Sequence, residues 1–302
     1  MTSTNYKPVK QKPGRLYAMV GFLVLLLAFV AVTFFLLTTE SRNEQLWIRL
    51  STDLQVHSQQ AAKSAAEAVE GNRAAFLQLG DSTGTISDAV EALKDGDPIR
   101  KLPALPRSMS ETLADLDTTW KRMNANARTI LEREAQVLAL AEASNNFIQT
   151  IPRIQELTDQ AIRELTRSGS SRQQLFVAGR QLVLSDRILR HLKEMLRGGA
   201  GAVAAADNFT KEIEYFEQTQ GALLKGSKSV GINQVTNTRA RDALDEAKLL
   251  FDEARPQLDT ILNSTTDILS VRGAADEIFV DSLDMFDLSR SISADVLFRS
   301  DS

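Results

Sequence analysis

The stretches LQVHSQQAA at residues 54–62 and QLVLSDRIL at residues 181–189 are two versions of one helical segment, 127 residues apart. The same offset pairs Ser58 with Ser185, Gly71 with Gly198 and Ile86 with Ile213. An offset of 131 aligns TIL at residues 129–131 with residues 260–262, and it pairs Trp120 with Phe251 and Ala143 with Ala274. Similar segments in a constant order are the signature of an internal repeat. The chain is therefore predicted to contain two copies of one module, residues 38–168 and residues 169–302.

Each copy is predicted to form four helices. Apolar residues recur in steps of three and four along the second copy, which is the pattern of a bundle helix: Leu244, Ala247, Phe251, Ala254, Leu258 and Ile261. Breaks between helices are expected at SGSS (168–171), at GGAG (198–201) and at the turn-rich segments 95–108 and 225–237. Pro152 and Pro256 are expected to kink or end helices. Short links favour antiparallel neighbours, so the expected fold is all-α, with two up-down four-helix bundles in an elongated rod.

A membrane anchor is predicted at the N-terminus. Residues 16–37, LYAMVGFLVLLLAFVAVTFFLL, contain no charged side chain and are long enough to span a bilayer as one transmembrane helix. Residues 1–15 hold four basic residues and no acid, so this tail is placed in the cytoplasm and the bulk of the chain outside. The expected location is a bacterial inner membrane with a periplasmic domain.

Composition narrows the classes of function. The chain has no Cys and two His, so neither a thiolate metal site nor a clustered histidine site is expected, and no cofactor is implied. No nucleophile–base pair or phosphate loop stands out, so an enzyme is not expected. The net charge of −4 includes the basic tail, and the remaining acidic surface argues against a nucleic-acid partner.

The order of segments resembles a known family. A basic tail, one span, a helix with the pattern L-x-x-x-S-Q-x-A-A-K (54–63) and the repeat are similar to the extracytoplasmic region of type IV pilus methyl-accepting chemotaxis transducers, the PilJ family. The likeness continues through NARTILEREAQVLAL (126–140), RQLVLSDRIL (180–189) and VTNTRARDALDEAKLLF (235–251). It implies a homodimeric receptor that controls twitching motility and senses a small ligand or pilin in the periplasm. Family members continue into a second span and a signalling coiled coil. The chain is therefore expected to be the N-terminal part of a longer receptor, in contact with chemotaxis adaptor and kinase only through that missing region; the alternative is a sensor without an output domain.

The first helix also resembles the ligand helix of nitrate-sensing histidine kinases, in which arginines of an L-R-x-x-S-Q-R pattern hold an anion. Here Gln55 and Gln60 replace those arginines, whereas Arg187 stands at the position of Gln60 in the second copy. The predicted ligand-binding residues are Ser58, Gln59, Gln60, Lys63, Ser185 and Arg187. Ser58 and Ser185 could equally be small residues that allow close helix approach.

Three functions remain open at this stage. The leading hypothesis is the sensor of a pilus-linked chemoreceptor, in which the helix leaving the membrane at Glu40 and the last helix, from about residue 266 to residue 298, shift against each other. The alternatives are the sensor of a nitrate-type histidine kinase and a membrane-tethered structural protein without a ligand.

Overall fold

The chain is helical throughout the part that the structure describes. The computed structural model describes residues 13–300, with the side chains of residues 22–30, 33 and 40–298. Within that part the regular elements are all helices: α1 (Pro13–Ala68), α2 (Arg73–Asp95), the 3-10 helix η1 (Arg107–Met109), α3 (Ser110–Leu131), α4 (Glu134–Arg167), α5 (Arg172–Arg197), α6 (Ala202–Lys225), α7 (Thr238–Glu253), α8 (Arg255–Asn263) and α9 (Thr265–Ser300). The predicted all-α class is confirmed.

The helices begin and end where the turn-forming residues stand. All four predicted breaks, at 95–108, 168–171, 198–201 and 225–237, fall between helices. Side chains cap three of the helices that follow a turn. Asn72 accepts a hydrogen bond from the Ala74 amide at the start of α2, and Asn237 accepts one from the Ala240 amide at the start of α7. Ser171 forms a capping box with Gln174 at the start of α5.

The two copies have the same local structure, down to the long loop inside each. In the first copy, Asp97 and Leu102 exchange backbone hydrogen bonds of 2.8 and 2.9 Å. In the second copy, Ser227 and Ile232 make the equivalent pair at 2.9 and 3.0 Å. Each loop opens on a glycine with positive φ, which a residue without a side chain adopts readily: Gly96 at 86° and Gly226 at 79°. The repeat seen in the sequence is therefore also a repeat of structure.

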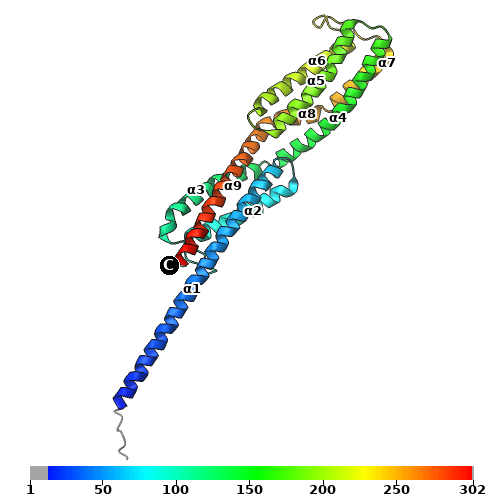
Figure 1. Ribbon diagram of the computed structural model, residues 1–302. Helices are drawn as coiled ribbons and strands as arrows, with labels where there is room; N and C mark the ends of the chain where they lie inside the picture. Colours follow the sequence, from blue (N-terminus) through cyan, green and yellow to red (C-terminus); the bar gives the residue numbers. More distant parts are fainter. Residues whose placement is uncertain (1–12, 301–302) are drawn as a thin grey trace, which may run out of the picture.

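The helices pack as two groups arranged end to end along a rod (Figure 1). The terminal bundle contains both ends of the described chain and consists of α1 from about residue 40, with α2, α3 and α9. The distal bundle consists of α4, α5, α6 and α7, with the short α8 against α4. The most extensive packing in the molecule is between α1 and α9, and α9 also packs along α3.

The bundles do not coincide with the two copies of the sequence. By position in the repeat, α4 is the fourth helix of the first copy and α9 that of the second, yet α4 packs with α5 and α7, and α9 packs with α1 and α3. The copies have exchanged their fourth helices. The expected division at residues 38–168 and 169–302 therefore describes the repeat along the chain, while each packed bundle takes three helices from one copy and one from the other.

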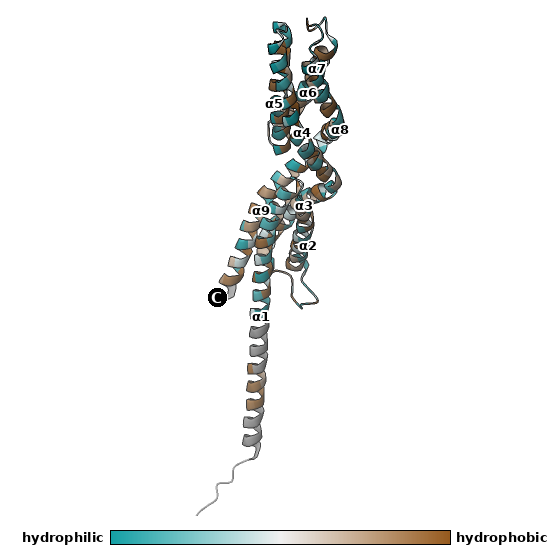
Figure 2. Ribbon diagram, turned by 90° about the vertical axis from the view of Figure 1, so that its right-hand side faces the viewer, coloured by the Kyte–Doolittle hydropathy of each residue, from teal (hydrophilic) through white to brown (hydrophobic). Residues whose placement is uncertain are grey.

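The core continues through the junction of the bundles. One cluster of buried apolar side chains runs from Trp47 in α1, through Phe147 in α4 and Phe209 in α6, to Phe251 in α7. Phe216 stacks on Phe251 with ring centroids 4.7 Å apart. A second, smaller cluster around Leu165 and Leu223 fills the far end of the distal bundle. Figure 2 shows hydrophobic and hydrophilic residues alternating along these helices.

The N-terminal part of α1 extends alone beyond the terminal bundle (Figure 1). α1 has 56 residues, a length of about 84 Å. Its described side chains at 22–30 include large apolar residues that face outward, among them Phe22, Leu25 and Phe29, each about 70% exposed, and this segment is brown in Figure 2. The predicted span, residues 16–37, lies partly outside the residues with described side chains. Among the described residues, no helix has an apolar stretch long enough to cross a bilayer.

Candidate functional site

Small side chains line the contact between α1 and α9. Ser51 and Ser58 of α1, and Ser282 and Ser289 of α9, are all fully or almost fully buried. Their hydroxyl groups donate to carbonyl oxygens of their own helix three or four residues earlier, at 2.6–3.2 Å, so burial leaves no donor unpaired. One side chain bridges the two helices, since Gln59 Nε2 donates to the Ser282 carbonyl oxygen at 3.1 Å. Few specific side-chain bonds therefore hold α1 against α9 in the described chain.

An ion pair between half-exposed Arg122 and buried Asp281 connects α3 to α9. Asp281 is 1% exposed and accepts from Arg122 Nε at 2.7 Å, and Arg122 Nη2 bonds to the same oxygen. Asp284, one turn further along α9, lies 3.7 Å from Arg122 Nη2. The hydrogen bond and charge of Asp281 raise the pKa of Arg122. The second oxygen of Asp281 is buried without a partner, so the carboxylate depends on Arg122.

The predicted ligand-binding residues of the first copy all lie on α1 but face different ways. Ser58 is buried in the α1–α9 seam, and Gln59 is occupied by its bond to α9. Gln60 is exposed, and Lys63 is an exposed side chain 3.8 Å from Glu67 one turn away. They form no common concave surface with the residues predicted in the second copy.

The predicted residues of the second copy lie in the distal bundle. Ser185 Oγ donates to the Leu182 carbonyl oxygen at 2.9 Å and accepts from Gln155 Nε2 of α4 at 3.1 Å. Arg187 faces α6, where its Nη1 lies 3.3 Å from Glu212 Oε1. Any anion bound by Arg187 would have to compete with this glutamate. Binding by the six predicted residues stays a prediction.

A pocket lies at the junction of the two bundles, and it was not among the sites predicted from the sequence. It has a volume of about 360 Å³ and is formed by the turn after α1, the start of α4, the end of α5 and the start of α9. Its apolar lining is Val69, Val137, Leu140, Ala141, Leu196 and Ile268. Its polar lining is Glu70, Ser144, Asn145, Lys193, Arg197 and Arg272.

The pocket has an excess of positive charge, with three cationic side chains against Glu70. Arg272 is half-buried, and its Nε atom is buried without a hydrogen-bond partner. Burial lowers the pKa of the Arg272 guanidinium from its ordinary value, whereas the charges of Glu70 and Asp276 raise it. The Ser144 hydroxyl is also buried without a partner. Unpaired buried polar groups are uncommon in folded proteins and are often associated with function.

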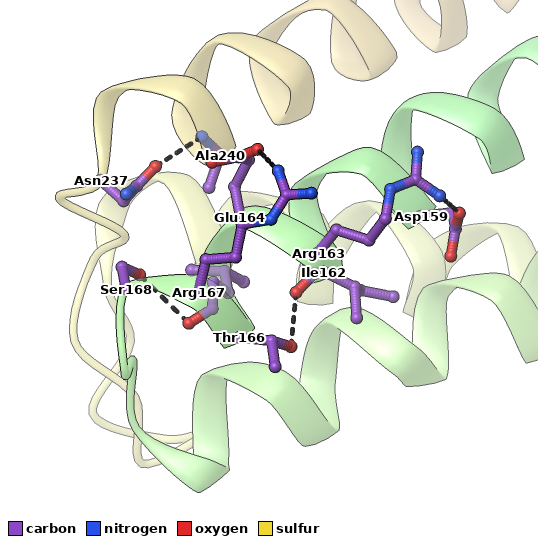
Figure 3. A network of polar contacts seen from close by, with 10 residues as sticks. Asp159, Ile162, Arg163, Glu164, Thr166, Arg167, Ser168, Asn237 and Ala240 are labelled. Carbon is purple, nitrogen blue, oxygen red and sulfur yellow. Dashed lines mark hydrogen bonds and ion pairs between the residues drawn. The ribbon is translucent and has the colours of Figure 1, made fainter.

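The far end of the distal bundle carries a different kind of polar surface (Figure 3). Arg167 bonds to Glu164 three residues away at 2.7 Å, and Thr166 donates to the Ile162 carbonyl oxygen at 2.8 Å. Asn237 caps α7 through the Ala240 amide at 2.9 Å. Apart from this cap, the contacts named here are between neighbours on one helix, and they stabilise the tip without forming a cavity.

Comparison with known proteins identifies the class of protein. Residues 36–145, which include most of α1 and the whole of α2 and α3, match the family described as "Type IV pili methyl-accepting chemotaxis transducer N-term". The chain therefore carries the N-terminal domain of the type IV pilus methyl-accepting chemotaxis transducers, the PilJ family, as the resemblance predicted.

Two curated relatives match well beyond that region. The chain is 36% identical over 276 residues to "Putative methyl-accepting chemotaxis AlkN" of Alcanivorax borkumensis, a match that covers 90% of this chain and 38% of the relative. It is 31% identical over 274 residues to "Protein PilJ" of Pseudomonas aeruginosa, covering 90% of this chain and 40% of the relative. The chain thus spans about two fifths of the length of these relatives.

Proposed function

We propose that the chain is the periplasmic sensory region of a chemoreceptor that controls type IV pili, and that it relays binding of pilin or a small ligand across the inner membrane. The observation that carries the proposal is the position of α9, which returns along α1 so that the first and last helices of the described chain lie side by side (Figure 1). Such a pair can convert a change in the far part of the molecule into a displacement at the end nearest the membrane.

The chemistry of the α1–α9 seam suits a small displacement. Both helices carry small, buried serines, and the described side-chain hydrogen bonds from α1 to α9 all come from Gln59, which donates to the carbonyl oxygen and the hydroxyl of Ser282. Packed helical interfaces favour a few discrete arrangements over continuous bending. A shift of α9 along α1 would also have to move Asp281 against Arg122, so this ion pair would set the energy difference between two positions.

The membrane and oligomer parts of the proposal rest on sequence and family. Residues 16–37 would form the transmembrane helix, with the basic tail in the cytoplasm, and the exposed apolar side chains at 22–30 suit a lipid surface. The receptor would act as a homodimer, without catalytic activity and without nucleic acid as a partner.

The test measures pilin binding and helix displacement in the chain of residues 1–302, reconstituted in lipid nanodiscs. Binding of purified pilin lacking its membrane helix is followed by analytical ultracentrifugation. Spin labels are attached at Gln60 and Leu283, which are exposed positions on α1 and α9, and native cysteines cannot interfere because the chain has none. We expect the distance between the labels to change when pilin is added.

A matched pair of labels at Gln60 and Asp88 reports on α1 and α2, which a short turn joins and which should move together. Saturable pilin binding with no change in the α1–α9 distance would disprove the relay. Absence of pilin binding would exclude pilin as the direct signal and leave a small ligand as the stimulus.

A further inference from the structure

The junction pocket combines an apolar wall with side chains that lack partners inside the protein. Lys193 and Arg197 make no hydrogen bond or ion pair to any residue that the structure describes, and Arg272 Nε is buried and unpaired. Glu70 faces the same space but makes no ion pair within 4.0 Å in the described chain. A buried donor nitrogen without a hydrogen-bond partner costs folding free energy that an anion bound beside it would recover.

The apolar wall of the pocket is common to both copies. Val69 of the first copy and Leu196 of the second are equivalent at the offset of 127, and Val137 and Ile268 are equivalent at the offset of 131. The pocket therefore lies where the equivalent segments of the two copies meet. At these positions both copies supply a branched apolar side chain, as the packing of the junction requires.

The charged positions of the pocket differ between the copies. Arg197 stands at the position equivalent to Glu70, and Arg272 at the position equivalent to Ala141. Ala141 shows that the helical junction can be built without a guanidinium at this place. The arginines of the second copy are thus additions to a shared scaffold, and packing does not account for their charge.

Gly198 makes room for the Arg272 side chain. A Cβ atom at residue 198 would lie 3.3 Å from the Cβ, Cγ and Cδ atoms of Arg272, and Gly198 has a φ of 81°. The turn after α5 therefore passes close against the stem of the arginine. This contact restricts the stem while the Nε atom stays without a partner.

We propose that the junction pocket binds a small monocarboxylate with a short alkyl chain. Its carboxylate would be held by Arg272, Lys193 and Arg197, because a guanidinium binds a carboxylate through two parallel hydrogen bonds. Its alkyl chain would lie against Val137 and Ile268. A volume of about 360 Å³ is at the small end of the range of ligand pockets. The inference rests on the proposed sensory function, for which it names the class of ligand.

The test is calorimetric titration of hexanoate into the chain of residues 1–302 in lipid nanodiscs, with empty nanodiscs as the blank. We expect saturable binding with one site per chain, and no saturable binding of 1-hexanol, which has the alkyl chain but no charge. Arg272→Gln should weaken binding by roughly 10- to 100-fold, since it removes charge-assisted hydrogen bonds. Glu70→Gln should strengthen binding, because it removes the acid that opposes the anion.

Two further variants separate the site from general effects. Lys193→Gln alters an exposed side chain, so the variant protein is expected to keep its fold. The variant should also bind hexanoate more weakly, because it lacks the positive charge of Lys193. Arg290→Gln removes an exposed arginine of α9, the helix that carries Arg272, but far from the pocket. This variant should leave hexanoate binding unchanged. Binding that is absent, or that survives Arg272→Gln and Lys193→Gln, would overturn the proposal. Sulfate competing as well as hexanoate would overturn the role of the alkyl chain.

The outcome is independent of the relay test. Hexanoate binding without any change in the α1–α9 distance would keep the pocket as a ligand site and remove the relay. A change in the α1–α9 distance with pilin but no hexanoate binding would support the relay and remove the pocket as a carboxylate site.

Discussion

Gly71 is the residue with the least room around it at the junction. It ends the turn between α1 and α2 with a φ of 90°, and a Cβ atom there would lie 2.4 Å from the Ala141 Cβ atom of α4. The turn and α4 can approach this closely only because residue 71 has no side chain. Gly199 has a similar φ of 79° but no atom within 4 Å of the position of a Cβ atom. Substituting each of these two glycines by alanine therefore distinguishes the effect of steric overlap from that of backbone strain.

We expect Gly71→Ala to lower the free energy of unfolding by roughly 3 kcal/mol, from backbone strain and overpacking together. Gly199→Ala should cost roughly 1 kcal/mol, from strain alone. Urea denaturation followed by circular dichroism measures both. Equal losses in the two variants would show that α4 can move away from the turn at little cost.

The Arg122–Asp281 pair gives a second prediction for single residues. Arg122→Gln would leave the Asp281 carboxylate buried and without its cation, and we expect a loss of roughly 3 kcal/mol. Arg153 makes two ion pairs as well, to Glu156 and Glu246, but all three side chains are at least half exposed. Arg153→Gln should therefore have little effect in the same urea experiment. A loss for Arg122→Gln no larger than this control would mean that water reaches Asp281.

At the scale of the element, the start of α7 depends on one side chain. Asn237 accepts a hydrogen bond from the Ala240 amide at 2.9 Å, and we expect Asn237→Ala to cost about 1 kcal/mol and to speed hydrogen exchange of the Ala240 amide. Asn146 is an exposed asparagine inside α4 without a capping role, and Asn146→Ala should be neutral or slightly stabilising. Unchanged exchange at Ala240 in Asn237→Ala would show that the cap does not hold the first turn.

The helix boundaries were largely predictable, because turn residues act locally. Gly96, Gly198 and Gly226 end helices through their own backbone conformation, so their effect can be read without knowing the neighbours. Proline was less decisive. Pro256 stands in the first turn of α8, where its missing amide costs nothing, whereas α4 continues through Pro152.

The partners of each helix were not predictable in the same way. A seam such as Leu244, Ala247 and Phe251 shows that a helix has an apolar face, but it does not show which helix covers that face. The two fourth helices, α4 and α9, descend from equivalent positions and so suit each other's partners. Nothing local distinguishes the exchanged arrangement from the unexchanged one.

The candidate pocket escaped prediction for a related reason, since its lining comes from three helices and the turn after α1. The aligned copies did contain a usable signal, namely the unlike pairs Glu70 with Arg197 and Ala141 with Arg272, at positions whose neighbours match. The residues chosen from sequence, Ser58 to Lys63 with Ser185 and Arg187, were selected from one helix segment and its repeat. Their spacing predicted where they lie along a helix, but it could not predict whether they line one cavity.

At the scale of the whole molecule, the exchange of fourth helices decides which fragments can fold. Residues 132–264 contain α4 to α8, the complete distal bundle, whereas residues 169–302 form one sequence copy and lack α4. We expect the first fragment to melt in a cooperative transition, followed by circular dichroism. The second fragment should show little cooperative melting, because α9 would lack α1 and α3. Cooperative folding of residues 169–302 would mean that the unexchanged arrangement is stable.

The exchange also fixes the order in which the molecule can be completed during synthesis. A chain is made from its N-terminus, so α1 emerges before the other described helices, while α9, which packs along α1 as α2 does, emerges after them. The distal bundle has all its helices once residue 263 has emerged, yet the part of α1 that packs against α9 stays uncovered until this 36-residue helix has been made. A nascent chain halted before residue 265 would therefore carry one finished bundle and one open helix layer, which is the form most exposed to chaperones and proteases.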